Sequence, residues 1–157
     1  MDGTLGRYST LSEVVNKSGT ATASALAAVT TVDGSKAVLK AGEAAAGTIF
    51  RWSLGGTKTG TNGTHTVDLA VNGTSVMTLT SDDTSAVDWS ASIILYIQGK
   101  ATQKILGVML LDTADNDVNY VDGTADMSSG CVLTVTHTTT SGDTATIDFC
   151  FVERLGT

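Results

Sequence analysis

The chain has 157 residues, with 9 basic against 16 acidic side chains, a formal net charge of −7 and a hydrophobic content of 41%. This length fits one ordinary domain with a core of its own, and the hydrophobic content excludes a disordered acidic tail. The acidic balance argues against nucleic acids and anionic membranes as partners, since both attract clustered basic residues. Lysines 36, 40, 100 and 104 are instead scattered among neutral residues.

Composition narrows the class of protein further. Charged residues make up only 16%, proline is absent, and there are 17 glycines and 27 threonines. The first residues, MDGTLGRYST, have neither the basic nor the apolar region of a secretory signal, so we expect synthesis in a cytoplasm. Apolar runs such as Val108 to Leu111 are far too short for a membrane-spanning helix.

The first 19 residues predict a short irregular arm ahead of a single domain over residues 20–157. Leu11, Val14 and Val15 form its one apolar patch, which fits a single helical turn and could contact a neighbouring protein. Residues 20–32 mix alanine with threonine and valine, and we interpret them as extended. Asp33-Gly34 then predicts a turn into a returning strand at 36–40.

Two stretches in the middle of the chain carry clear strand patterns. Over 47–55, Phe50, Trp52 and Leu54 alternate with polar or smaller residues, which predicts a half-buried strand with Trp52 in the core. Over 64–80, Asn72-Gly73 between two β-rich runs predicts a hairpin with a type I′ turn. A two-residue loop would pair position 71 with 74, 69 with 76 and 67 with 78.

The second half of the chain adds four more strands and one short strand inside a loop. Residues 90–99 are apolar on both faces, which predicts a central strand covered on both sides, paired with 101–111. Residues 112–130 predict a long acidic loop with a short strand at 118–121. Residues 131–140 and 143–154 predict a last hairpin, in which Ile147, Phe149 and Phe151 share one face.

The eight or nine strands, without a convincing helix, predict an all-β fold. We expect an antiparallel β-sandwich of about eight strands, jelly-roll-like, with the short irregular N-terminal arm. An immunoglobulin-like sandwich is the alternative, although that fold usually needs fewer residues and strands.

The two cysteines, Cys131 and Cys150, both fall in predicted strands. Two buried thiols that pack as small apolar groups are the simpler interpretation. A disulfide remains open if their strands are neighbours and the side chains face each other.

The acidic loop offers a candidate calcium site, and no other cofactor is expected. Asp115, Asp117 and Asn119 stand at steps 1, 3 and 5 of a calcium loop, and Asp126 stands at step 12. Tyr120 replaces the glycine expected at step 6, and aspartate replaces the usual glutamate at step 12. A solvated acidic loop is therefore the alternative.

Nothing in the chain indicates catalysis, so we expect no enzymatic activity. His65 and His137 could be combined with a serine and an aspartate, but no nucleophile motif accompanies them. We interpret both as exposed, hydrogen-bonded histidines on strands. Trp89, in a polar stretch, could instead lie on a binding surface, or with Trp52, Tyr96 and Tyr120 form a platform on which sugars stack.

The runs AGTIFRWSLGGTKTGTNGTHTVDLAVNGTSVMTLT and ILGVMLLDTADNDVNYVDGTADMSSGCVLTVTHTTTSGDTATIDFCFVE resemble small β-sandwich structural proteins of tailed bacteriophages. The resemblance covers about residues 47–154 and rests on threonine- and glycine-rich hairpins with few charges. It implies a capsid decoration protein on the virion surface, a homotrimer with the major capsid protein as partner, made in the host cytoplasm. A carbohydrate- or receptor-binding jelly-roll module of a tail fibre or baseplate, using Trp89 and a calcium-loaded acidic loop, is the alternative.

Overall fold

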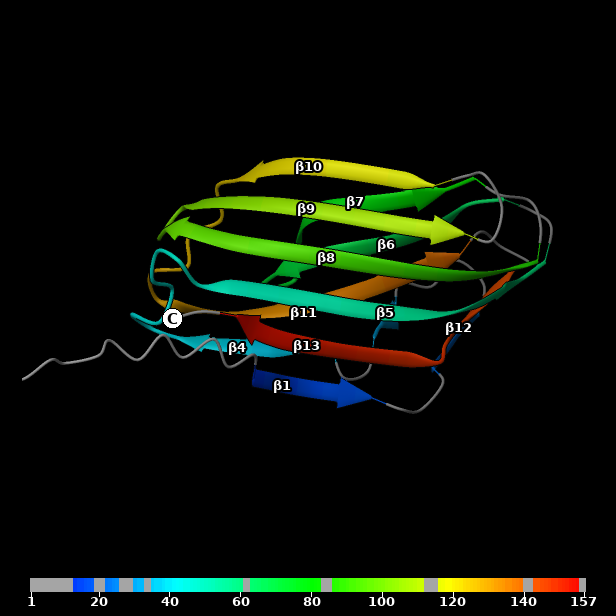
Figure 1. Cartoon of the computed structure of the whole chain (residues 1–157), viewed down its shortest axis with the longest axis horizontal. Helices are drawn as coiled ribbons and strands as arrows, with labels where there is room; N and C mark the ends of the chain where they lie inside the picture. The colour runs from blue at the N-terminus through cyan, green and yellow to red at the C-terminus, as the bar shows by residue number, and fades with distance from the viewer. Residues whose placement is uncertain are drawn as a thin grey trace, which may run out of the picture.

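The computed structural model describes residues 13–18, 22–25, 30–32, 35–60, 63–82, 86–111, 116–139 and 143–155. These residues form β-strands joined by turns and irregular segments, and the strands lie in two layers (Figure 1). All strand pairs are antiparallel. The all-β sandwich expected from the sequence is thus confirmed.

The first layer, called the large sheet here, contains eight strand segments. They are β1 (Glu13–Ser18), β2 (Thr22–Ala25), β5 (Ile49–Thr59), β8 (Val87–Gly99), β9 (Thr102–Leu111), β10 (Asp117–Gly123), β12 (Thr144–Ile147) and β13 (Phe149–Leu155). The second layer, the small sheet, contains β3 (Thr30–Thr31), β4 (Ala37–Lys40), β6 (His65–Val71), β7 (Thr74–Ser81) and β11 (Gly130–Thr139).

Several of these segments are halves of one interrupted strand. β1 and β2 both run along the β12–β13 segment, and β3 and β4 both run along β11. Taking the halves together, the large sheet has the order β1/β2, β12/β13, β5, β8, β9, β10, and the small sheet has the order β3/β4, β11, β6, β7. The chain crosses repeatedly between the layers, which is the double Greek key of a jelly roll, and β9 and β10 extend it beyond β8.

The N-terminal segment differs from the sequence-based expectation. Residues 13–18 form β1 and pair with β13, so the helical turn predicted around Val14 and Val15 is wrong, and this part of the arm belongs to the large sheet. Leu11 lies outside the described residues. β pairing is decided by the neighbouring strand, and a six-residue segment carries no periodic signal long enough to reveal that neighbour.

The core lies between the sheets and is built from alternating residues of each strand. Phe50, Trp52 and Leu54 of β5 are buried, which confirms Trp52 as a core residue, and the Trp52 indole Nε1 donates to the carbonyl oxygen of Ser35 at 2.8 Å. β8 contributes Ile93, Leu95 and Ile97 to the same layer. The opposite face of β8 is not covered by any described part of the chain, although the sequence predicted a strand buried on both sides.

The hairpin of β6 and β7 has the predicted turn but a shifted register. Asn72 and Gly73 have φ angles of 50° and 80°, as a type I′ turn requires, and Val71 pairs with Thr74 as expected. After the next pair, Ala70 with Ser75, Val76 is an extra residue in β7 without a partner in β6. Leu69 therefore pairs with Met77 and Val67 with Leu79, one residue further along than predicted. This bulge keeps Met77 and Leu79 buried.

A second irregularity separates β12 from β13. Asp148 forms a bend whose backbone N–H donates to the carbonyl oxygen of Gly55 at 2.8 Å. Ile147 before the bend points into the core, whereas Phe149 after it is exposed. The prediction that Ile147 and Phe149 share a face is therefore wrong, because one unpaired residue reverses the alternation.

Candidate functional site

The outer face of the large sheet is the strongest candidate for a functional surface. Residues paired across β13, β5, β8, β9 and β10 form four rows on it. The rows are Phe149–Gly55–Ser90–Leu110, Phe151–Ser53–Ser92–Val108–Val118, Glu153–Arg51–Ile94–Leu106–Tyr120 and Leu155–Ile49–Tyr96–Lys104–Asp122. Figure 1 looks onto the strands that carry these rows.

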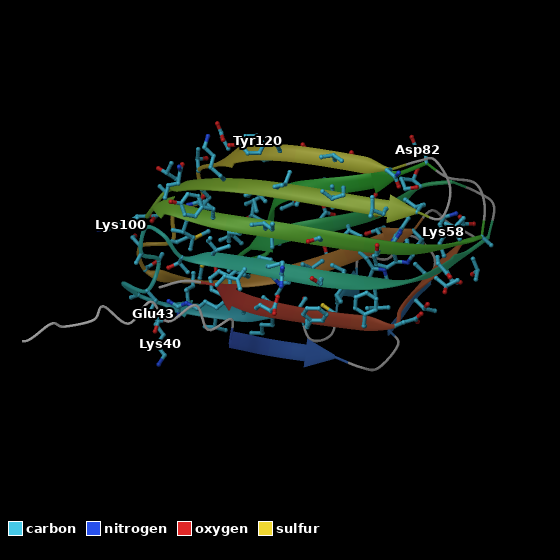
Figure 2. All side chains as sticks on the ribbon, viewed as in Figure 1. Lys40, Glu43, Lys58, Asp82, Lys100 and Tyr120 are labelled. Atoms are coloured by element: carbon cyan, nitrogen blue, oxygen red, sulfur yellow. The ribbon has the colours of Figure 1, made fainter. Side chains whose placement is uncertain are left out.

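Most exposed large apolar side chains lie on this face. The described residues include seven such side chains, and six of them belong to the rows. Val118 at 64% and Tyr120 at 58% are the two most exposed. Tyr120 stands at the β10 edge of the sheet in Figure 2. The seventh, Val38, is alone on the small sheet. Contiguous apolar surface of this kind is typical of protein contact sites.

Small residues form a shallow depression at one end of the face, across its first two rows. Its volume is about 220 Å³, and Ser53, Ser90 and Ser92 lie along it, with Phe149 on one side and Leu110 on the other. The Phe149 ring lies over Gly55: a Cβ there would be 2.8 Å from a ring carbon. The face therefore has aromatic and aliphatic ridges on either side of a serine-lined trough.

The charges on this face are paired with each other. Arg51 Nε donates to Glu153 Oε2 at 2.8 Å, and Lys104 Nζ contacts Asp122 Oδ1 at 2.5 Å. Hydrogen bonds to Asp122 and then to Tyr120 raise the pKa of Lys104, while the bond from Lys104 lowers the pKa of Asp122. The four rows thus carry two cations and two anions, although the whole chain carries a net charge of −7.

The outer face of the small sheet has a different character. Threonines occupy its central rows: Thr138, Thr66 and Thr80 in one, and Thr136 and Thr78 on either side of Asp68 in the next. Asp68 Oδ1 accepts hydrogen bonds from the hydroxyls of Ser75 and Thr78. Such a surface is well suited to water.

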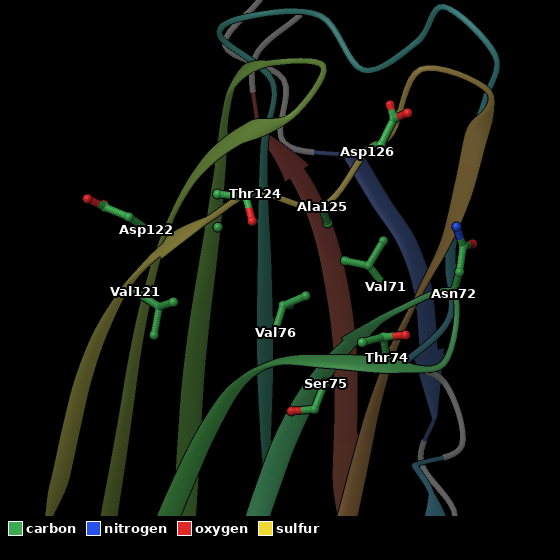
Figure 3. Close-up of a pocket in the computed structure, with 11 residues that line it drawn as sticks. Val71, Asn72, Thr74, Ser75, Val76, Val121, Asp122, Thr124, Ala125 and Asp126 are labelled. Carbon is green, nitrogen blue, oxygen red and sulfur yellow. The ribbon is translucent and has the colours of Figure 1, made fainter.

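A polar groove of about 460 Å³ lies between the tip of the β6–β7 hairpin and the end of β10 (Figure 3). Val71, Thr74 and Val76 line one side, and Val121 and Asp126 the other. The backbone N–H of Ser128 donates to Asp126 at 2.9 Å, which lowers the pKa of this carboxyl. The groove holds no converging set of buried polar groups among its described residues.

The predicted calcium loop is not formed. Residues 117–123 are strand β10, which extends for about 20 Å at 3.3 Å per residue and so separates Asp117 from Asp126. Asp117 Oδ2 accepts from the backbone N–H of Thr80 at 2.8 Å, and Asn119 Nδ2 donates to the carbonyl oxygen of Thr78 at 2.9 Å. These side chains join β10 to β7 across the layers. Asp115 lies outside the described residues, and no metal-binding cluster occurs in the part that the structure describes.

The histidines are buried, which corrects the expectation of exposed, hydrogen-bonded side chains. The rings of His65 and His137 are fully buried, 6.0 Å apart between centroids, and neither makes a hydrogen bond. Burial, then His137 and Lys58, lowers the pKa of His65 to about 3; burial lowers the pKa of His137 to about 4. Both rings are therefore neutral and shielded from solvent, and no substrate can reach them there.

A buried ion pair lies at the same end of the sandwich. Lys58 Nζ is 3.0 Å from Asp143 Oδ2, and both side chains are fully buried. Figure 2 shows Lys58 where β5 reaches this end. Sequence reasoning missed this pair because nothing local to either residue distinguishes it from a surface charge.

Trp89 does not belong to a surface. It is only 4% exposed, and its ring contacts His65 edge-on with centroids 4.5 Å apart. Because Trp52 is buried as well, the predicted stacking platform for sugars is not formed, and Trp89 is excluded as an interface residue. The side chains of Val14 and Val15 lie outside the description, so their predicted contact with a neighbour stays a prediction.

Both cysteines are buried thiols, as the simpler interpretation predicted. Cys131 is in β11 of the small sheet and Cys150 in β13 of the large sheet, so they are not on neighbouring strands and the disulfide alternative fails. Burial raises the pKa of the Cys131 thiol, which keeps it protonated.

Comparison of the chain with known proteins does not assign it to a family. A scan against protein-family models gives no match. A search of curated proteins gives no relative either. Within the described ranges, no helix has the length and hydropathy needed to cross a bilayer.

Proposed function

We propose that this chain is a virion structural protein of the capsid decoration type, without enzymatic activity, that acts as a homo-oligomer on the outer surface of a viral shell. The observation that carries the proposal is the apolar outer face of the large sheet. Six exposed large apolar side chains on one regular sheet face suit a lasting contact with protein, not a transient contact with a small ligand.

The fold and the composition support the same role. A jelly-roll sandwich offers broad, rigid faces, and such a protein binds by area and shape, not through a deep pocket. The homotrimer and the major capsid protein, both implied by the phage resemblance, remain predictions of this proposal, as does the position on the virion.

Binding to shells tests the role directly. Purified protein would be mixed with particles of the source virus that lack this chain, then sedimented. We expect the protein to sediment with the shells and to raise their melting temperature, because a bound partner stabilises the assembled state. Protein that stays in the supernatant at every concentration would contradict the proposal.

A further inference from the structure

We propose that the outer face of the large sheet docks a second copy of the same chain about a two-fold axis that runs across the middle of the face. The inference deepens the proposed structural role, on which it rests for the expectation of a permanent partner. The pattern of β8, the charge of the face and its area each support it.

The strand pattern calls for a cover that the described chain does not supply. Residues 90–99 carry two large apolar side chains, Ile94 and Tyr96, on the outer side of the strand, among the polar Ser90, Ser92 and Gln98. The structure covers Ile93, Leu95 and Ile97 but leaves Ile94 half-buried and Tyr96 exposed. A second sheet packed on this side, at the usual spacing of about 10 Å, would complete the burial that the pattern indicates.

Electrostatics permit two copies to meet here. A protein with a net charge of −7 repels its own copies on most approaches. The charged members of the four rows form two internal pairs, Arg51–Glu153 and Lys104–Asp122, so these rows carry no net charge, and the further carboxylate of Asp88 lies at the end of the face beyond Ser90. Two such faces approach without like charges opposed at the centre.

The size of the face matches a stable interface. Four rows and five strands span about 20 Å by 20 Å between Cα atoms, given about 3.4 Å per residue and 4.8 Å between strands. With the side chains at its rim this becomes on the order of 700 Å², close to the roughly 800 Å² that each partner buries in a standard complex.

The distribution of apolar residues favours two copies over three. A ring of three needs two different patches on each copy, whereas a two-fold pair uses one patch twice. Among the side chains that the structure describes, six of seven exposed large apolar residues share one face. The pair is thus an alternative to the trimer that the resemblance implies, and the mass in solution decides between them.

Measurement of mass in solution tests the pairing. Sedimentation equilibrium of the full chain, over a range of concentrations, should give twice the monomer mass of 16.0 kDa. Leu110→Asp and Phe149→Asp each place a carboxylate in the proposed contact, where it would lie buried without a partner. Each should raise the dimer dissociation constant by on the order of a hundredfold.

Val38→Asp is the matched control, because Val38 is equally exposed and apolar but lies on the small sheet. This variant should remain a dimer, and circular dichroism should show all variants folded. A monomer at every concentration, a mass of three copies, or a dimer that Leu110→Asp leaves intact would overturn the pairing. A monomer that still sediments with shells would leave the virion role standing, so the two proposals fail separately.

Discussion

The two outer faces of the sandwich carry different types of strand-forming residue. Both are regular antiparallel surfaces, and both need side chains with high strand propensity. The small sheet meets this need with threonine, in rows such as Thr138–Thr66–Thr80. The large sheet meets it with valine, isoleucine, leucine and aromatic residues, of which Val118 and Tyr120 are the most exposed.

The difference separates a face suited to water from a face suited to protein. A threonine hydroxyl bonds to water while its methyl group keeps the β-branched shape. Val118 and Tyr120 also favour strands but expose apolar surface. Because the chain uses threonine freely, its absence from the central rows of the large sheet shows that strand propensity does not account for the apolar face.

Lowering the pH should destabilise the small sheet before the large sheet, and this should be the largest of the predicted effects on folding stability. His65 and His137 project inward from β6 and β11 with pKa values of about 3 and about 4, against 6.5 in the unfolded chain. The unfolded state binds more protons, so stability is complete above pH 6.5 and is lost as the pH falls towards 4. At about 1.4 kcal/mol per pKa unit, the total loss is on the order of several kcal/mol.

Urea unfolding at pH 7.5, 5.5 and 4.5 measures this loss, and hydrogen exchange should show β6 and β11 opening before β8. Aspartates have a pKa of 3.8 in the unfolded chain and therefore stay mostly ionised down to pH 4.5. The variant His65→Phe/His137→Phe should be much less sensitive to acid. Equal stability of the natural chain at pH 7.5 and 4.5 would show that the buried rings do not couple the small sheet to pH.

Breaking the buried ion pair should have the next largest effect on the free energy of unfolding. It should leave the residues of both outer faces unchanged. Lys58→Met leaves the Asp143 carboxylate buried and without its cation, which typically costs about 3–5 kcal/mol. The double variant Lys58→Met/Asp143→Leu should recover part of that loss. Urea unfolding measures both, and a single variant that loses less than about 1 kcal/mol would contradict the burial of this pair.

Filling the space under Phe149 should have an intermediate effect, confined to the large sheet. A Cβ at Gly55 would be 2.8 Å from both the Phe149 ring and the carbonyl oxygen of Trp89, so Gly55→Ala should cost about 1–3 kcal/mol. In a Phe149→Ala background the thermal-unfolding penalty should shrink but not vanish, since the backbone contact remains. An unchanged penalty would mean that the ring does not rest on Gly55.

Exchanging residue types between the faces should affect stability least. Thr136→Val on the small sheet and Leu110→Thr on the large sheet should each change the unfolding free energy of the dilute chain by no more than about 0.5 kcal/mol. Only Leu110→Thr should weaken self-association in sedimentation equilibrium. Equal weakening by both would remove the distinction between the two faces.

Strand periodicity predicted much of this architecture. The alternation around Trp52 and the Asn72-Gly73 turn appear in the structure. Two predicted hairpins are wrong: residues 131–140 and 143–154 lie in different sheets, and residues 36–40 do not return along the segment before them, because β3 and β4 run in the same direction along β11. The other errors occur where one residue changes the register, at the bulge of Val76 and the bend of Asp148. Such irregularities depend on the partner strand and on packing, which local patterns do not contain.

The surface features were harder to predict than the fold. Asp117 and Asn119 have the spacing of calcium ligands, but a strand directs them to the backbone of β7. His65 and Trp89 lie in polar stretches, yet both are buried. The apolar residues of 90–99 predicted a strand buried on both faces, but the described chain covers only one of them.

The pairing of the first and last described strands makes the fold nearly circular. β1 runs antiparallel to β13, and Glu13 is the partner of Arg154. A short linker between these two positions, with a new opening in the exposed Asn72-Gly73 turn, would keep every strand beside its present neighbours. Chain connectivity could thus be rearranged without altering either layer, and a peptide fused near either position would emerge from the same corner of the molecule.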